Sequence, residues 1–436
     1  MLSKFLALRG LVNKGGGGGS SGGGSSVSKK DVNFYDYDGT LLHSYTVKEA
    51  QKLTELPPLP AQPGLICQGW NWSLEDIKAE SGAVDAGAMY ITDDGTTRIY
   101  ITLNEGRTSP MLGVGVNGTV TVDWGDGTEP DVLTGTSIST VKQTPNHNYD
   151  APGEYVIRLT VVDGEIAFSS PFNGAGESVI LLWDSTSDTR NRAYVTAVRK
   201  VEIGTATRVL SGAFNGLNNL ESVTIPIATN ISGGYIFLSC KHLVHVNIPC
   251  SATSIGDSAF KYCSSLAHVS IPGSVTSIGS SAFVQCYSLA YVSIHSGVTS
   301  IGSSAFYECY CLTSISIPDG VTSIGGSAFY KCIGLTSISI PDGVTSIESS
   351  VFYSCSSLTS ITIPNSVTSI NSSAFNNCKV VAFYDFTQHT SVPTLSSTNA
   401  FTGIPTDCEI RVPAALYDEW IAATNWSTYA SYIKAV

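Results

Sequence analysis

One residue type constrains the architecture of this 436-residue chain more than any other, because phenylalanine recurs every 23 residues through the second half without a slip. A fixed repeat of this length predicts a solenoid, in which each repeat forms one coil that cannot bury its own apolar side and therefore stacks on its neighbours. A solenoid offers a long sheet surface and no built-in catalytic pocket, so we expect a binding protein and not an enzyme. The column consists of Phe214, Phe237, Phe260, Phe283, Phe306, Phe329, Phe352 and Phe375.

Cysteine keeps the same period, three residues after each phenylalanine from the second repeat on. Adjacent coils lie ~4.8 Å apart, and stacked side chains keep their Cβ atoms at that separation, which is wider than the ~3.8 Å of a typical disulfide. We therefore interpret the column as buried thiols that pack as small hydrophobic groups. A metal ladder is disfavoured because the chain has no CxxC pair and no matching histidine column, and no cofactor is expected. The column consists of Cys240, Cys263, Cys286, Cys309, Cys332, Cys355 and Cys378.

A single repeat reads LTSISIPDGVTSIGGSAFYKC, starting at Leu312. In its first strand, residues 312–318, the leucine and both isoleucines are predicted to face inward and the two central serines outward. This pattern resembles the Treponema-type, or BspA-like, leucine-rich repeat, and the resemblance covers residues 201–380. It implies a leucine-rich-repeat solenoid, covered at its end by a capping unit over residues 381–436.

The outward positions of these strands change along the array, and they are the best guide to binding. The early repeats place His245, His268 and Tyr291 in one outward column, with Asn247 beside them, whereas the later repeats carry almost uniform serine. A second stripe lies next to the phenylalanine column on the opposite side, and exposed aromatic groups beside hydroxyls suit sugar or protein recognition. The alternative is that these tyrosines only shield the coil edge. The stripe consists of Tyr307, Tyr330 and Tyr353.

The chain begins with a short apolar peptide, residues 1–14, and a glycine- and serine-rich linker, residues 15–30. The apolar stretch is broken by Arg9 and lacks a cleavage site, so it does not read as a signal peptide. The first 26 residues are either a docking tag or a disordered tail. No apolar run approaches the ~20 residues of a membrane helix, so no membrane insertion is expected.

Residues 31–80 predict a small β-rich module, with a strand, an Asp-Gly turn and a second strand in VNFYDYDGTLLHSYTV. The segment resembles the β-grasp repeats of bacterial surface proteins related to the internalin B-repeat. The resemblance rests on Asp38-Gly39-Thr40, the proline pair Pro57-Pro58, and a closing strand from Gly64 to Gly69-Trp70.

Residues 84–172 predict a β-sandwich from alternating strands at 97–103, 119–124 and 155–162. Trp124-Gly125-Asp126-Gly127-Thr128 and the later His147-Asn148-Tyr149 resemble a polycystic-kidney-disease (PKD) domain, which has an immunoglobulin-like fold. The resemblance implies a spacer or a weak binding module. Asp123 and Asp126 fit the chemistry of a tight turn before they fit a calcium site.

A connector and N-terminal cap, residues 173–200, would join this module to the solenoid, and Pro413 would open an amphipathic helix in the C-terminal cap. The expected fold is therefore mainly β and multi-domain. The opening motif also matches the signature of haloacid-dehalogenase-type phosphatases, with Asp36 as nucleophile and Asp38 as general acid. That chemistry needs a parallel α/β sheet, and no βαβ alternation follows, so this is the least favoured reading.

Charged residues make up only 13% of the chain, the net charge is −12, and no basic block exists. Nucleic acid is therefore excluded as the main partner. We expect a non-enzymatic adhesion protein that recognises a cell-surface protein or glycan, either on a phage tail or as a bacterial surface adhesin. A purely structural spacer is the alternative. The modules are of extracellular type, so an extracellular, cell-surface or virion location is expected, while the ligand and the oligomeric state are not predicted.

Overall fold

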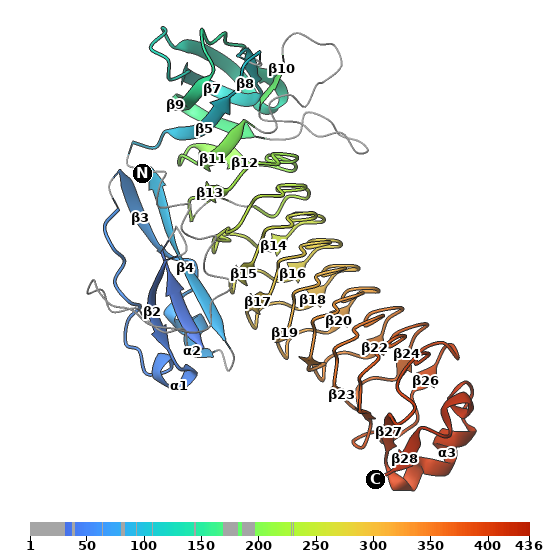
Figure 1. Ribbon diagram of the computed structural model, residues 1–436. Coiled ribbons are helices and arrows are strands. Elements are labelled where there is room, and N and C mark those ends of the chain that lie inside the picture. The colour runs from blue at the N-terminus through green and yellow to red at the C-terminus, as the bar shows by residue number, and fades with distance from the viewer. Residues whose placement is uncertain are drawn as a thin grey trace, which may run out of the picture.

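The computed structural model describes residues 31–36, 40–62, 64–79, 83–92, 94–106, 108–143, 145–168, 182–184, 197–227, 229 and 231–436. The predicted N-terminal peptide and linker lie outside these residues. The chain is mainly β and only 6% helical, and its second half is a solenoid of about ten turns with a period of about 23 residues, which confirms the predicted fold class. Among the described residues, two larger sheets and a separate two-stranded pair precede the regular coils, and a helical segment follows the last coils (Figure 1).

The first sheet has the strand order β2-β1-β4-β3, with a parallel pair, β1 and β4, at its centre. One face carries two short helices, and its core includes Phe34, Trp70 and Trp72. A capping box between Thr46 and Glu49 starts the first helix. The elements are β1 (Val32–Tyr35), β2 (Leu41–Tyr45), α1 (Val47–Ala50), β3 (Leu65–Trp70), α2 (Leu74–Ala79) and β4 (Val84–Thr92).

Strand β4 corrects the predicted boundary between the first two modules. We placed residues 84–92 at the start of the sandwich, but this strand pairs with β1 and β3 in the first sheet. The reason is its nearly continuous burial from Val84 to Ile91, which is typical of a central strand covered on both faces.

The second sheet has the order β13-β11-β5-β9-β7-β8, with β12 paired to β9, and a separate pair joins β10 to β6. Because β11 pairs with β5 on one side and in parallel with β13 on the other, the sheet runs directly into the first coils of the solenoid. The strands are β5 (Thr97–Leu103), β6 (Pro110–Leu112), β7 (Val114–Asp123), β8 (Asp131–Gln143), β9 (Gly153–Phe168), β10 (Leu182–Asp184), β11 (Val198–Glu202), β12 (Thr207–Val209) and β13 (Ser222–Thr224).

The turn after β7 uses its aspartates as hydrogen-bond acceptors. Asp123 Oδ1 accepts the Gly125 N–H at 2.8 Å, and Asp126 Oδ1 accepts the Thr128 N–H at 3.2 Å. The His147 ring stacks on Trp124 with centroids 4.9 Å apart, and its Nε2 lies 2.6 Å from Asp126 Oδ2. These contacts place both aspartates in turn chemistry.

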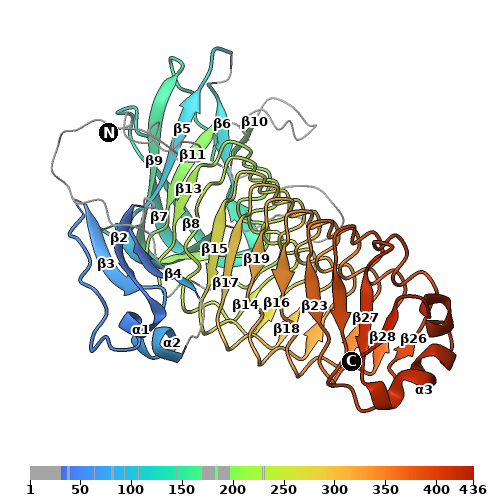
Figure 2. The same ribbon diagram turned by 60° about the horizontal axis from the view of Figure 1, so that its bottom comes forward.

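Two parallel ladders run along the solenoid, one on each side of the coil, and each pairs residues 23 apart in most registers. Figure 2 shows the strands of both ladders side by side. The sheet face carries β15 (His268–Ile271), β17 (Tyr291–Ile294), β19 (Ser314–Ile315), β21 (Ser337–Ile338), β23 (Ser360–Thr362), β25 (Phe383–Asp385), β27 (Glu409–Val412) and β28 (Ile433–Ala435). The second ladder carries β14 (Ser254–Ile255), β16 (Ser277–Ile278), β18 (Ser300–Ile301), β20 (Ser323–Ile324), β22 (Ser346–Ile347), β24 (Ser369–Ile370) and β26 (Thr394–Leu395).

The eight phenylalanines of the period are buried and stack through the solenoid core, with neighbouring centroids 5.2 to 5.7 Å apart. Each cysteine of the column donates its S–H to the carbonyl of the phenylalanine 26 residues earlier, as Cys286 does to Phe260 at 3.1 Å. Burial raises the pKa of these thiols, that of Cys378 to about 12, so they stay protonated. The thiol column therefore links adjacent coils by hydrogen bonds as well as by packing.

Two positions in each regular coil adopt a left-handed backbone, one before the Ala-Phe pair and one before the cysteine. Ser281 has φ of 59° and Gln285 has φ of 57°. This conformation costs a non-glycine residue about 1–2 kcal/mol. Coil-to-coil hydrogen bonds offset the cost, because the Ser281 N–H donates to the Ser303 carbonyl and the Gln285 N–H donates to the Tyr307 carbonyl, both at 2.8 Å.

The last coil is closed by an aromatic cluster that includes Phe386, Phe401 and Trp426. As predicted, the chain after Pro413 is helical, with the buried Trp420 on its inner side. The helical elements are η3 (Ala414–Leu416), α3 (Tyr417–Ala422) and η4 (Trp426–Tyr429).

Candidate binding surfaces

The first sheet lies against the sheet face of the early coils (Figure 1). Asn247 Nδ2 donates to the Ala88 carbonyl of β4 at 2.9 Å, and Ser293 Oγ donates to the Ala83 carbonyl at 3.3 Å. Gly87 comes so close that a Cβ added there would lie 2.2 Å from Asn247 Oδ1. The outward side chains of the early coils therefore contact the backbone of β4 directly.

Aromatic side chains complete this interface. Trp72 Nε1 donates to Ser270 Oγ at 2.5 Å, and the Trp72 ring meets the buried His295 edge-on at 5.1 Å. The Tyr35 ring lies 5.6 Å from that of His268, which in turn contacts His245 at 4.8 Å. We call residues 31–92 the N-terminal module, and its contact with these coils the docking interface.

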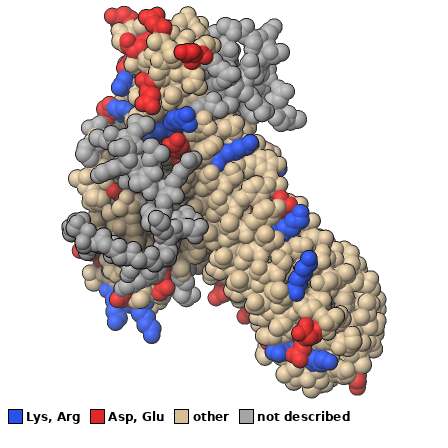
Figure 3. Space-filling model, viewed as in Figure 1, with Lys and Arg blue, Asp and Glu red and all other residues tan. Residues whose placement is uncertain are grey.

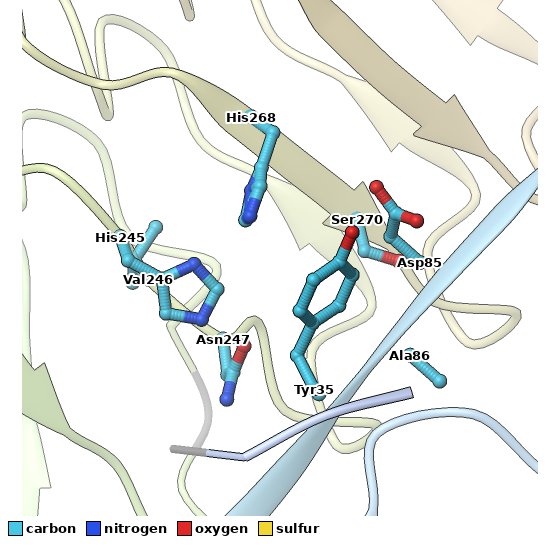
Figure 4. A pocket seen from close by; sticks show the side chains of 9 residues that line it. Tyr35, Asp85, Ala86, His245, Val246, Asn247, His268 and Ser270 are labelled. Carbon is cyan, nitrogen blue, oxygen red and sulfur yellow. The ribbon is translucent and has the colours of Figure 1, made fainter. Parts of the chain in front are cut away.

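A small pocket remains within the docking interface (Figure 4). Its cavity volume is about 10 Å³, far below the ~300–1,000 Å³ typical of ligand sites. Side chains from the N-terminal module and from the early coils fill the space around it, so the pocket has the size of a packing defect. It is lined by Tyr35, Asp85, Ala86, Gly87, His245, Val246, Asn247, His268 and Ser270.

This arrangement corrects the expected exposure of the early sheet face. We predicted His245, Asn247 and His268 as an open binding surface, but the N-terminal module covers them, and Tyr291 is half-buried in the same column at the start of β17. The physical reason is complementarity, because Asn247 bonds to the backbone of β4 and His268 packs against Tyr35 of β1.

The second predicted stripe lies away from the docking interface, and its three tyrosines are half-buried. Tyr307, Tyr330 and Tyr353 stack with centroids 4.5 and 4.7 Å apart and ring planes within 2° and 7° of parallel. A neighbouring pair, Tyr287 and Tyr310, stacks at 5.1 Å. Sequence reasoning missed this pair, although both residues directly follow a cysteine of the column. We call the five residues the tyrosine ridge.

A polar row runs between the two rows of the tyrosine ridge. Glu308 accepts from Gln285 Nε2 at 2.9 Å and from Lys331 Nζ at 3.0 Å, so its carboxylate is neutralised within the row. Lys331 also lies 5.5 Å from the Tyr330 ring centroid. Desolvation, followed by nearby charges, raises the pKa of Tyr287, which therefore keeps its proton at neutral pH. The ridge thus presents rings and hydroxyls beside one ion pair, without net charge.

The sheet face beyond the docking interface is flat and hydroxylated, with exposed Ser314, Ser316, Ser337 and Ser339. On the side shown in Figure 3, charged side chains are sparse over the solenoid and denser over the far end of the second sheet. The solenoid therefore presents more hydroxyls and aromatic rings than charged groups to a binding partner.

The structure gives the phosphatase motif no catalytic setting among the residues it describes. Asp36 is buried and accepts a hydrogen bond from Gln62, while Asp38 lies outside the described residues. Within the described ranges, no group of three or more His, Cys, Asp or Glu side chains could hold a metal ion. None of the helices described there is long and apolar enough to cross a membrane.

Comparison with known proteins identifies the repeats. The model of the BspA type leucine-rich repeat region matches residues 193–310 and 278–406, with six copies. The solenoid is thus a BspA-like leucine-rich-repeat region. No curated protein is significantly similar to the chain.

Several solved structures are similar to part of this chain. The leucine-rich-repeat protein TpLRR of T. pallidum is 24% identical, over 49% of this chain and 81% of that one, with a TM-score of 0.32. A leucine-rich cell surface protein of Faecalibacterium prausnitzii is 24% identical, over 55% and 77%, with a TM-score of 0.29. The pneumococcal vaccine antigen PcpA is 17% identical, over 52% and 75%, with a TM-score of 0.27.

Proposed function

We propose that this chain, whose repeats form a BspA-like leucine-rich-repeat solenoid, is a non-enzymatic adhesion protein that binds a cell-surface protein or glycan. The observation that carries the proposal is the tyrosine ridge, where rings from successive coils stand in register at 4.5 to 5.1 Å on a surface without net charge. Aromatic side chains supply large contact area at a low cost in conformational entropy, which suits recognition.

The two N-terminal parts are inferred to position the solenoid. The strand order β2-β1-β4-β3, with its central parallel pair, supports the β-grasp-like interpretation of the first module. The stacked Trp124 and His147 beside an aspartate turn support the PKD-like interpretation of the second. We place the protein outside the cell, on a bacterial surface or a phage tail, where an adhesive solenoid meets its partner.

A structural spacer is the second candidate, and a specific observation favours it. The later coils carry nearly uniform serine on their sheet face, and threonine hydroxyls join successive coils, as Thr359 does by donating to the Thr336 carbonyl at 3.2 Å. These features strengthen the stack without selecting a ligand. The two candidates differ in whether the tyrosine ridge binds anything.

The test is binding of the purified full chain to intact bacterial cells, measured by flow cytometry with a labelled protein. We expect saturable binding that falls when Tyr310 and Tyr330 are both changed to alanine. The matched control changes Ser337 and Ser339 on the sheet face to alanine and should leave binding unchanged. Absence of saturable binding to every cell type tried would favour the spacer.

A further inference from the structure

The tyrosine ridge is periodic, and its period restricts what can lie along it. One row places a tyrosine on three successive coils and the other row on two, with neighbouring ring centroids 4.5, 4.7 and 5.1 Å apart. A ligand that makes the same contact with several coils must therefore repeat at nearly this spacing. A globular partner has no such repeat and would contact the coils in different ways.

Common biological polymers can be compared with this spacing. An extended peptide presents equivalent side chains every second residue, at ~6.6–6.8 Å, and a DNA strand advances ~3.4 Å per nucleotide while carrying a charge at each step. Both fall out of register with the coils after one or two repeats. A pyranose linked through opposite sides of its ring advances a glycan chain by about the length of the ring, which is close to the coil spacing. Because successive β-1,4-linked sugars are turned over, equivalent sugar edges recur at every second coil.

The chemistry of the ridge selects a neutral ligand. Because the rings stack within 2° and 7° of parallel, they cover one another's faces and leave edges and hydroxyls outward. Burial, followed by nearby charges, raises the pKa of Tyr307 and Tyr310, so both hydroxyls keep their protons at neutral pH. The one carboxylate between the rows, Glu308, is paired with Lys331. The surface thus offers hydrogen bonds and no net charge.

We propose that a linear, neutral polysaccharide lies along the solenoid axis over the tyrosine ridge, with about one sugar for each coil. This inference rests on the proposed adhesive function and names its ligand class. Contacts of the same kind then add along the chain, so affinity is expected to depend on ligand length. Recognition by edges and hydroxyls also distinguishes this mode from the stacking of one sugar on one exposed ring.

The first test measures length dependence by isothermal titration calorimetry on the full chain. The probes are neutral β-1,4-linked oligosaccharides of glucose, of mannose and of N-acetylglucosamine, from dimer to octamer, with sulfated cellulose oligomers as the charged comparison. We expect affinity to rise with each added sugar up to the span of the ridge and then to level off. Affinity that is independent of length, or higher for the sulfated oligomers, would overturn the proposal.

The second test uses variants of the central ring. Tyr330→Phe keeps the stacked ring and removes only the hydroxyl, and we expect about tenfold weaker binding of the longest oligosaccharide, with unchanged thermal unfolding. Tyr330→Ala should weaken binding further and flatten the length dependence. The control pair Ser337→Ala and Ser339→Ala should bind like the parent chain. Equal binding by the parent chain and Tyr330→Phe would rule out recognition through the hydroxyls.

The failure of this inference can be separated from failure of the proposed function. Suppose that the parent chain binds cells, that the Tyr310/Tyr330 variant does not, and that no neutral oligosaccharide of any length binds. The proposed polysaccharide ligand is then wrong, and the adhesive function stands with a protein partner. If neither cells nor oligosaccharides bind, both proposals fall. Binding of long oligosaccharides and of cells, both lost in the same variant, supports both.

Discussion

The early and later coils share one backbone but differ in what touches their sheet face. At the same strand positions, the early coils carry His268 and Ser270 under the N-terminal module, whereas the later coils expose Ser337 and Ser339 to solvent. The early residues are not spare binding groups, because they contact β1, β4 and Trp72. Divergence within a repeat array can therefore mark an intramolecular contact as readily as a ligand site.

The two regions are also held together differently. Every coil is stabilised by its stacked phenylalanine and by backbone bonds to its neighbours, such as Phe260 N–H to the Ala282 carbonyl at 2.8 Å. The docking interface adds side-chain bonds to backbone carbonyls of the module at Ala83 and Ala88. Changes in the coil core should therefore act alike in both regions, and changes at outward positions should act only in the early one.

The largest effect is expected from the shared core. Phe260→Ala in a covered coil and Phe352→Ala in a bare one should each lower the free energy of unfolding by about 3–5 kcal/mol, because each removes a fully buried ring. Chemical denaturation followed by circular dichroism would measure both. A loss in one region and unchanged stability in the other would break the equivalence of the two cores.

A smaller effect, confined to the early coils, is expected at Gly87. Gly87→Ala places a Cβ 2.2 Å from Asn247 Oδ1 and should weaken docking by about 1–3 kcal/mol through overpacking. Hydrogen exchange of β4 and β15 amides would increase, with little change in the later coils. Asn247→Gly removes the obstructing side chain, so adding it to Gly87→Ala should restore part of the protection. Absence of any rescue would show that the strain lies elsewhere.

A matched pair of serines sharpens the comparison further. Ser270→Ala removes the acceptor of the Trp72 indole N–H and should weaken docking by about 1–3 kcal/mol. Ser339→Ala changes the equivalent position of a bare coil and should be neutral. Hydrogen exchange of the β4 amides would report the first change. Equal stability of the two variants would contradict the docking interface as described.

The smallest effect concerns pH and the charged second sheet. The Arg98 guanidinium lowers the pKa of the Asp94 carboxyl to about 2. A depressed folded pKa stabilises the protein above the ordinary value near 3.8, and the stabilisation is lost as pH falls toward 2. Asp94→Asn should remove this pH dependence, and because the pair is partly exposed, the change should stay below about 1 kcal/mol. Thermal unfolding between pH 5 and pH 2 would measure it.

The sequence predicted the solenoid because a fixed period is a property of the whole array and survives local variation. It could not predict the docking interface, since the strands of the N-terminal module carry no signal for which distant surface they will cover. The outward histidines were visible, but their partners, such as Trp72 and Tyr35, lie some 200 residues earlier in the chain. The apolar run of β4 was assigned to the wrong sheet for the same reason, because burial on both faces depends on a neighbour in space.

Other features were hidden by residue type. Ser281 and Gln285 occupy left-handed positions. A glycine at these positions would have indicated a positive φ in the sequence. The thiol hydrogen bonds also lack a sequence signal, because a buried cysteine looks like any small apolar residue until its acceptor carbonyl is placed. The outer pair of the tyrosine ridge could have been found, since Tyr287 and Tyr310 are 23 residues apart.

The stacking of the coils also has a mechanical consequence. The hydrogen bonds between coils run along the solenoid axis, so tension between its ends passes through every interface in series. The weakest interface yields first, and each coil released adds up to roughly 80 Å of extended chain. A tether built this way lengthens in steps under load and keeps its remaining coils folded.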